Sequence, residues 1–105
     1  MGKYMSNNMN KLEEDYPELY DIVDKLNDMV YDGEVLDEKT LKLIAIAIAA
    51  STNNDVAIKM QMKHGLDDYG ITKNEIMDVL KIVLLLAGKP AFTKSIGVLY
   101  SLIDE

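Results

Sequence analysis

An unbroken run of eight apolar residues, from Leu43 to Ala50, is the feature that most constrains how this chain can fold. The run is far shorter than the roughly 20 apolar residues that a membrane-spanning helix needs. Alanine occupies alternate positions and lets neighbouring helices approach closely. Because a helix without a polar face is buried on every side, we expect this segment to be packed against other helices all round.

The rest of the chain carries the signals that begin and end helices. Proline suits a first helical turn because its missing N–H would be unpaired there, which predicts a helix from Pro17. Gly33 is expected to end that helix in a left-handed conformation. The segment Thr72-Lys73-Asn74-Glu75 is a capping box, the clearest local signal in the chain. The expected helices cover approximately residues 17–32, 38–51, 55–69, 73–87 and 90–103.

These segments and their short links predict an all-α fold, a bundle of about five helices without strands. Residues 1–10 are expected to form a flexible N-terminal lead-in, and residues 11–105 a single domain. The chain contains no cysteine, so disulfides cannot stabilise it. Additional stability must therefore come from good helix packing or from association with other chains.

Charge and composition exclude several classes of partner. The formal net charge is −7, and nucleic-acid binding is not expected because it depends on basic side chains that neutralise phosphates. An anionic membrane surface is disfavoured for the same reason. The polar start of the chain shows no secretory signal, so the sequence predicts a cytoplasmic protein.

Three segments follow one another in a recognisable order. They are 32–47, which contains Leu-Asp-Glu-Lys-Thr before the apolar helix, then 69–76, and then Ala-Gly-Lys-Pro-Ala at 87–91. In order and spacing they resemble the carboxymuconolactone decarboxylase family, which includes the alkylhydroperoxidase D-like proteins, over residues 30–103. The resemblance implies an alkylhydroperoxidase D-like helical fold that assembles as trimers or hexamers.

The resemblance also implies two chemistries. The first is thiol peroxidase or disulfide reductase activity with an antioxidant role, using a Cys-x-x-Cys pair with a glutamate and a histidine as proton relay. In this chain the relay glutamate falls on Lys42, the two cysteines on Asn54 and Ala57, and the histidine on Gln61. Because the peroxidatic group must be a reactive thiolate, thiol peroxidase chemistry is not expected here. The second is decarboxylation of a muconolactone, whose helical histidine is absent from the matching position.

His64 is the only histidine and lies three residues after Gln61, on nearly the same helical face. Its ordinary pKa of about 6.5 makes it a candidate general base, while the alternative is a surface or satisfied polar histidine. Lys42 is the other catalytic candidate, and its pKa should be depressed if it is desolvated. With one histidine and no cysteine, neither a metal site nor a cofactor is expected.

Two functions remain open. One is a diverged oligomeric binding or scaffold protein, with a pocket for a small-molecule ligand lined by Lys42, Asn54, Ala57 and Gln61. The other is a lyase or hydrolase that acts on a small acid or lactone without thiol chemistry. Whether the chain is an enzyme is therefore left undecided by its sequence.

The apolar surface of the expected bundle predicts self-association. Residues 43–50 have no polar face, and Ile82, Leu85 and Leu86 lie away from the main apolar stripe of their helix. A bundle of this length has too few helices to cover both surfaces. We therefore expect an obligate homo-oligomer, a trimer or hexamer.

Overall fold

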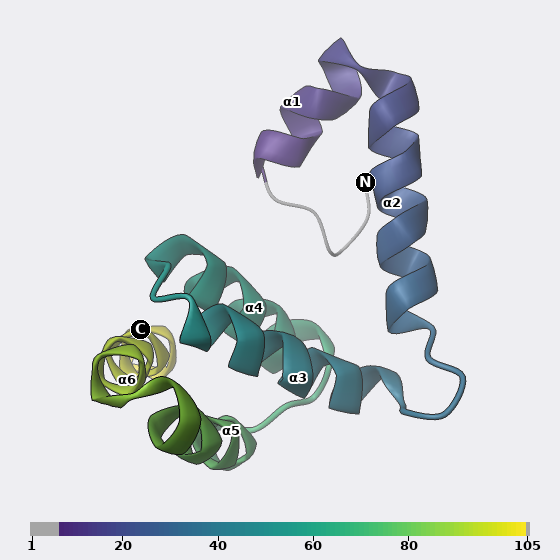
Figure 1. The fold of residues 1–105 in the computed structure, drawn as a ribbon. Helices are drawn as coiled ribbons and strands as arrows, with labels where there is room; N and C mark the ends of the chain where they lie inside the picture. The colour runs from purple at the N-terminus through teal and green to yellow at the C-terminus, as the bar shows by residue number, and fades with distance from the viewer. Residues whose placement is uncertain (1–6, 105) are drawn as a thin grey trace. The chain divides into compact units, whose positions relative to one another are not determined.

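The computed structural model describes residues 7–104, which hold six α-helices and no strand (Figure 1). The helices are α1 (Asn7–Asp15), α2 (Pro17–Tyr31), α3 (Glu38–Ser51), α4 (Asp55–Asp68), α5 (Lys73–Ala87) and α6 (Lys89–Ile103). The prediction of an all-helical chain is confirmed for this part of the sequence. None of these helices is both long enough and apolar enough to cross a membrane.

One helix, α1, was not expected from the sequence. It includes residues 7–10 of the segment interpreted as a flexible lead-in, and residues 1–6 of that segment lie outside the described part of the chain. The chain divides into two compact units, residues 1–38 and residues 39–105. A single domain over residues 11–105 stays a prediction.

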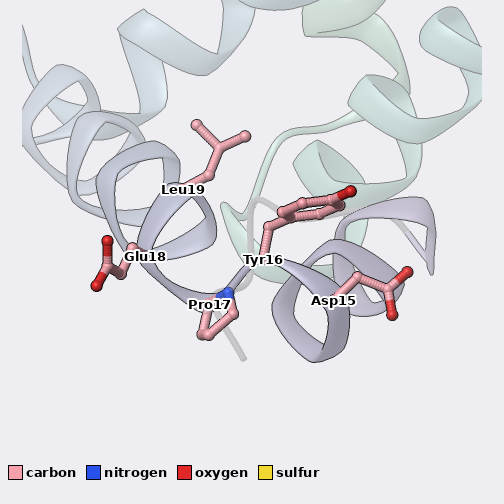
Figure 2. A pocket seen from close by; sticks show the side chains of 5 residues that line it. All are labelled: Asp15, Tyr16, Pro17, Glu18 and Leu19. Atoms are coloured by element: carbon pink, nitrogen blue, oxygen red, sulfur yellow. The ribbon is translucent and has the colours of Figure 1, made fainter.

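The first unit is a hairpin in which α1 packs against α2. Pro17 stands at the first turn of α2, as the sequence predicts, and Figure 2 shows it at the bend with Tyr16 beside it. The buried side chains of α2 are Tyr20 and Tyr31, three helical turns apart on one face. Aromatic side chains bury more area than aliphatic ones, so these two tyrosines are the main apolar burial of α2.

The second unit packs α6 against both α4 and α5. Each of its four helices contributes fully buried aliphatic side chains at helical spacing. They include Ile46, Ile58, Met62, Ile76, Leu80 and Leu99. Burying one such side chain stabilises the fold by roughly 1.5–3 kcal/mol, so this cluster is the main source of stability of the unit.

The helix ends follow local sequence signals with one exception. The capping box is present, because the Thr72 hydroxyl accepts from the Glu75 N–H at 3.1 Å and the Glu75 carboxylate accepts from the Thr72 N–H at 2.9 Å. Gly70 adopts a positive φ of 66° after α4. The prediction of a left-handed Gly33 is wrong, because Gly33 does not have a positive φ. Asp32 ends α2 instead, since its N–H donates to the Asp28 carbonyl and its φ is −92°.

The apolar helix α3 departs from its expected environment. Ile46 and Ala50 are fully buried, but Ile44 is 44% exposed and Ile48 is 62% exposed. The prediction that this helix is buried on every side is therefore wrong for a single chain. The reason is geometric, because the other helices of its unit cover only one of its faces.

Candidate functional site

Lys42 is a buried lysine, with only 1% of its surface exposed. It lies one turn before Ile46 on α3, so helical spacing places it on the buried face of that helix. Its ammonium donates a hydrogen bond of 2.7 Å to Oε1 of Gln61 on α4. The same ammonium lies 4.9 Å from the centroid of the Tyr69 ring. An amide oxygen and an aromatic face therefore both contact this buried amine.

Gly65 brings α4 close to the stem of Lys42. A Cβ atom at this position would lie 3.1 Å from the Cδ1 atoms of both Ile46 and Ile71, and 3.6 Å from Cγ of Lys42. Contacts of 3.1 Å between carbon atoms are shorter than the optimal separation. The absence of a side chain at residue 65 thus allows the two helices to approach at the level of the buried amine.

His64 is half-buried on α4, next to Gly65. Partial burial lowers the pKa of its imidazole, and the positive charge of Lys42 lowers that pKa further. Asp68 and Asp67 act in the opposite direction. At neutral pH the imidazole is therefore mostly uncharged, which is the form that accepts a proton. A catalytic role for His64 stays a prediction.

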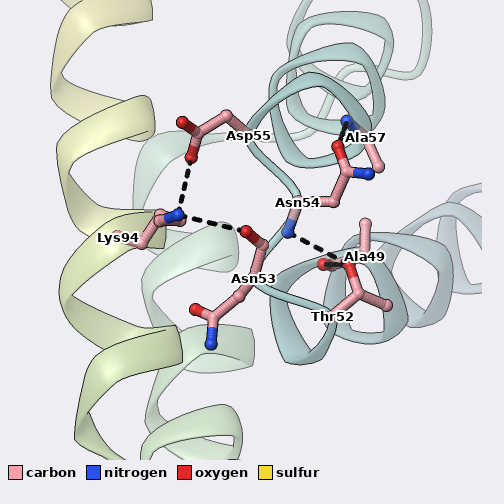
Figure 3. A network of polar contacts seen from close by, with 7 residues as sticks. All are labelled: Ala49, Thr52, Asn53, Asn54, Asp55, Ala57 and Lys94. Atoms are coloured by element: carbon pink, nitrogen blue, oxygen red, sulfur yellow. Dashed lines mark hydrogen bonds and ion pairs between the residues drawn. The ribbon is translucent and has the colours of Figure 1, made fainter.

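Asn54 and Ala57 lie together at the start of α4. The side chain of Asn54 is the N-cap, and its Oδ1 accepts a hydrogen bond of 3.0 Å from the Ala57 N–H. Nearby, the ammonium of Lys94 on α6 contacts the Asn53 carbonyl at 3.2 Å and the Asp55 carboxylate at 3.5 Å (Figure 3). This end of α4 is held by capping and by a tie to α6.

The four positions taken from the family pattern thus form two pairs, Lys42 with Gln61 and Asn54 with Ala57. Residues 54 and 61 are separated by about two turns of α4, or roughly 10 Å along the helix axis. Lys42 is buried, whereas Asn54 is exposed to solvent. That all four line one ligand pocket stays a prediction.

Two neighbours of Lys42, Tyr69 and Gly65, were not identified as site residues from the sequence. Met62, Gly65 and Tyr69 are all buried, and their spacing of three and four residues is the signal that places them on one face. In the described part of the chain, no group of three or more His, Asp or Glu side chains is arranged to hold a metal ion.

Comparison with known proteins places the chain among relatives. The model of the carboxymuconolactone decarboxylase family matches residues 17–100. The uncharacterized protein MJ0742 of Methanocaldococcus jannaschii is 52% identical over 99 residues, which cover 94% of this chain and 95% of that protein. The uncharacterized protein MJ1511 of the same organism is 40% identical over 80 residues, covering 76% of this chain and 74% of that protein.

Proposed function

The chain belongs to the carboxymuconolactone decarboxylase family, and we propose that it is a diverged member acting as a binding or scaffold protein without thiol chemistry. The observation that carries this proposal is the hydrogen bond of 2.7 Å between Lys42 and Gln61. These residues stand where the thiol-dependent proteins that this chain resembles have a relay glutamate and histidine. An amide does not titrate, so Gln61 cannot take up and release a proton as the histidine of the relay would.

The two cysteine positions of the pattern hold Asn54 and Ala57, and the chain has no cysteine elsewhere. Reduction of an organic hydroperoxide by this route needs a thiolate as nucleophile. Asn54 instead caps α4 through its side-chain oxygen. Residue 54 therefore has a structural role, as a helix cap, and no redox role. The support for an antioxidant role is the family resemblance.

A peroxide-consumption assay on metal-free purified protein tests the first part of the proposal. We expect only background consumption, the same as for a heat-unfolded sample of the chain. Turnover well above that level, unaffected by a chelator, would contradict it.

Ligand retention tests the second part. Native mass spectrometry of protein purified from its own cells should show a bound small molecule on the wild-type chain. The variant Lys42→Met should lose that molecule, whereas Lys59→Met, a change of the same type at an exposed lysine, should keep it. If both variants retain the molecule equally, the molecule does not bind at Lys42 and this part of the proposal is wrong.

The proposal includes a homo-oligomer, a trimer or hexamer, in the cytoplasm. Its support is the exposure of large aliphatic side chains, since Leu85 is 77% exposed and Leu86 is 79% exposed in the single chain. Leaving such a side chain in water forgoes roughly 1.5–3 kcal/mol of burial energy. Light scattering at micromolar concentration is decisive, because a stable species near 11.8 kDa would contradict an oligomer.

The second candidate function is a lyase or hydrolase step on a small acid or lactone. It is favoured by the lowered pKa of His64, which gives an uncharged imidazole beside a buried amine. The variant His64→Gln should then abolish turnover of a small lactone, while Lys63→Gln on the exposed side of α4 should not. Unchanged turnover in His64→Gln would remove this candidate.

A further inference from the structure

The helix α2 carries a row of exposed apolar side chains. We call this row the α2 stripe and define it by Leu19, Ile22, Leu26 and Met29. Each of these residues has more than half of its surface exposed in the single chain. Tyr20 and Tyr31, the buried residues of α2, lie on a different side of the helix, so the packing of the hairpin leaves the stripe in solvent.

The spacing of the α2 stripe is that of a surface that binds another helix. Its successive members are three, four and three residues apart, which are the a and d positions of a heptad repeat. Residues 19–29 span roughly 15 Å of the helix axis, or close to three turns. An amphipathic helix with apolar side chains at the same spacing therefore fits the stripe.

Charge decides which helices can bind to the stripe. Residues 1–38 carry eleven acidic residues and three lysines, a formal net charge of −8, whereas residues 39–105 carry seven acidic residues and eight lysines. The exposed charged residues of α2 beside the stripe are Glu18, Asp21, Lys25 and Asp28. Three of these four are acidic, and we call them together the acidic edge. A basic partner is attracted to this edge, whereas a second copy of the same helix is repelled by it.

We propose that the α2 stripe binds a basic amphipathic helix of another protein. Apolar side chains of that helix pack on the stripe at heptad spacing, and its lysine or arginine side chains pair with the acidic edge. Removal of apolar surface from water drives the contact, and the charges determine which partner is accepted. The inference goes beyond the proposed function, because the stripe shares no residue with the Lys42 site and its partner is not a second copy of this chain.

Three designed peptides test this proposal on the full chain. The first has about three heptads, with leucine at the a and d positions and lysine at the flanking positions. The second has the same composition with its leucines spread around the helix, and the third has glutamate in place of each lysine. Binding is followed by the fluorescence anisotropy of labelled peptide, at concentrations where the peptide alone is monomeric. We expect the first peptide to bind at least about tenfold more tightly than either of the others.

A variant of the stripe locates the binding. Ile22→Ser should weaken binding of the first peptide at least about tenfold, because it removes one large apolar side chain from the contact. Its far-ultraviolet circular dichroism should stay that of the wild type, since Ile22 is 64% exposed in the single chain. Val56→Ser is the matched control on α4, at a residue that is 72% exposed, and should bind the peptide as the wild type does.

Variants of the acidic edge test the role of charge. Asp21→Asn combined with Asp28→Asn should weaken binding of the first peptide and make the binding less dependent on salt. Asp78→Asn combined with Asp104→Asn removes the same number of charges from exposed residues of α5 and of the end of α6, and should leave binding unchanged. If Ile22→Ser does not fold, the peptide comparison and these edge variants decide.

Several results would overturn the inference. Equal binding of the first and second peptides would show a general attraction between opposite charges, and no binding of the first peptide would contradict the stripe as a helix-binding surface. Equal binding by the wild type and a folded Ile22→Ser would place the peptide elsewhere. The chain has no cysteine, so Ile22→Cys carries a single thiol. If that thiol becomes protected from labelling as the concentration of the chain rises without peptide, a second copy covers the stripe and the inference is wrong.

Discussion

Replacing Gln61 by leucine removes one acceptor of the buried ammonium of Lys42 and keeps most of the side-chain volume. Hydrogen bonds to charged groups contribute roughly 1.5–3 kcal/mol to stability, and the loss of such a bond is largest where the remaining group is buried. Because Lys42 is only 1% exposed, water cannot readily replace the lost oxygen. We therefore expect Gln61→Leu to lower the free energy of unfolding by about 1.5–3 kcal/mol.

Removing the other partner should be much less harmful. Lys42→Met keeps the packing of the aliphatic stem against α4 and removes an ammonium whose burial opposes folding. Gln61 is half-buried and can turn its amide towards water. We expect the double variant to match Lys42→Met, which gives a coupling energy of roughly 1.5–3 kcal/mol between the two side chains.

Urea denaturation of the four proteins at one fixed concentration measures this cycle. With a slope of about 1–3 kcal/mol per molar urea, Gln61→Leu should unfold at a midpoint roughly 1 M lower than the wild type. Lys59→Met serves as the control, since an exposed substitution of this type changes stability by less than about 0.5 kcal/mol. A loss below about 0.5 kcal/mol in Gln61→Leu, with no coupling in the cycle, would refute the view that Gln61 stabilises a buried charge.

Four further predictions concern the same region and its flanks. In a titration followed by NMR, His64 should show a pKa below its ordinary value, which Lys42→Met should partly restore; a wild-type value at or above the ordinary one would contradict the burial. Because the pKa of His64 is lower in the folded state, the unfolded state binds more protons as the pH falls. The free energy of unfolding should therefore be highest above about pH 6.5, the pKa of an ordinary histidine, and should decrease as the pH falls from there through the lowered pKa. The same decrease should be smaller in His64→Gln. Thr72→Ala should lower the free energy of unfolding by about 1 kcal/mol, measured by urea denaturation, and an unchanged midpoint would argue against the capping box. Gly65→Ala should lower the melting temperature. The new methyl group would crowd Ile46 and Ile71 at a cost of about 1–3 kcal/mol, which outweighs a gain of about 1 kcal/mol in helix propensity. A more stable variant would show that these two side chains can move aside.

Local signals predicted most helices of the described chain. The capping box at Thr72 and the proline at residue 17 mark helix starts in the structure as they do in the sequence. The helix α1 was missed because its nine residues include only two apolar ones, Met9 and Leu12, and a helix this short depends on packing against α2. The left-handed Gly33 was predicted wrongly because Asp32 closes the last turn of α2 by itself.

The candidate site was predicted in part. Family positions directed attention to Lys42 and Gln61, which the structure brings into contact. The Tyr69 ring beside the same amine could not be predicted, because it depends on how the end of α4 packs against α3. Residues that are far apart in the sequence meet through tertiary packing, about which helical periodicity carries no information.

Glycine at residue 65 has a consequence for how sequences of this fold can vary. The space that a side chain there would need is already filled by the tips of Ile46 and Ile71. A relative with alanine or serine at this position should therefore carry a smaller residue, such as valine, at one of the other two. Residues 46, 65 and 71 are thus expected to change together, and a comparison of many relatives should reveal them as a co-varying group.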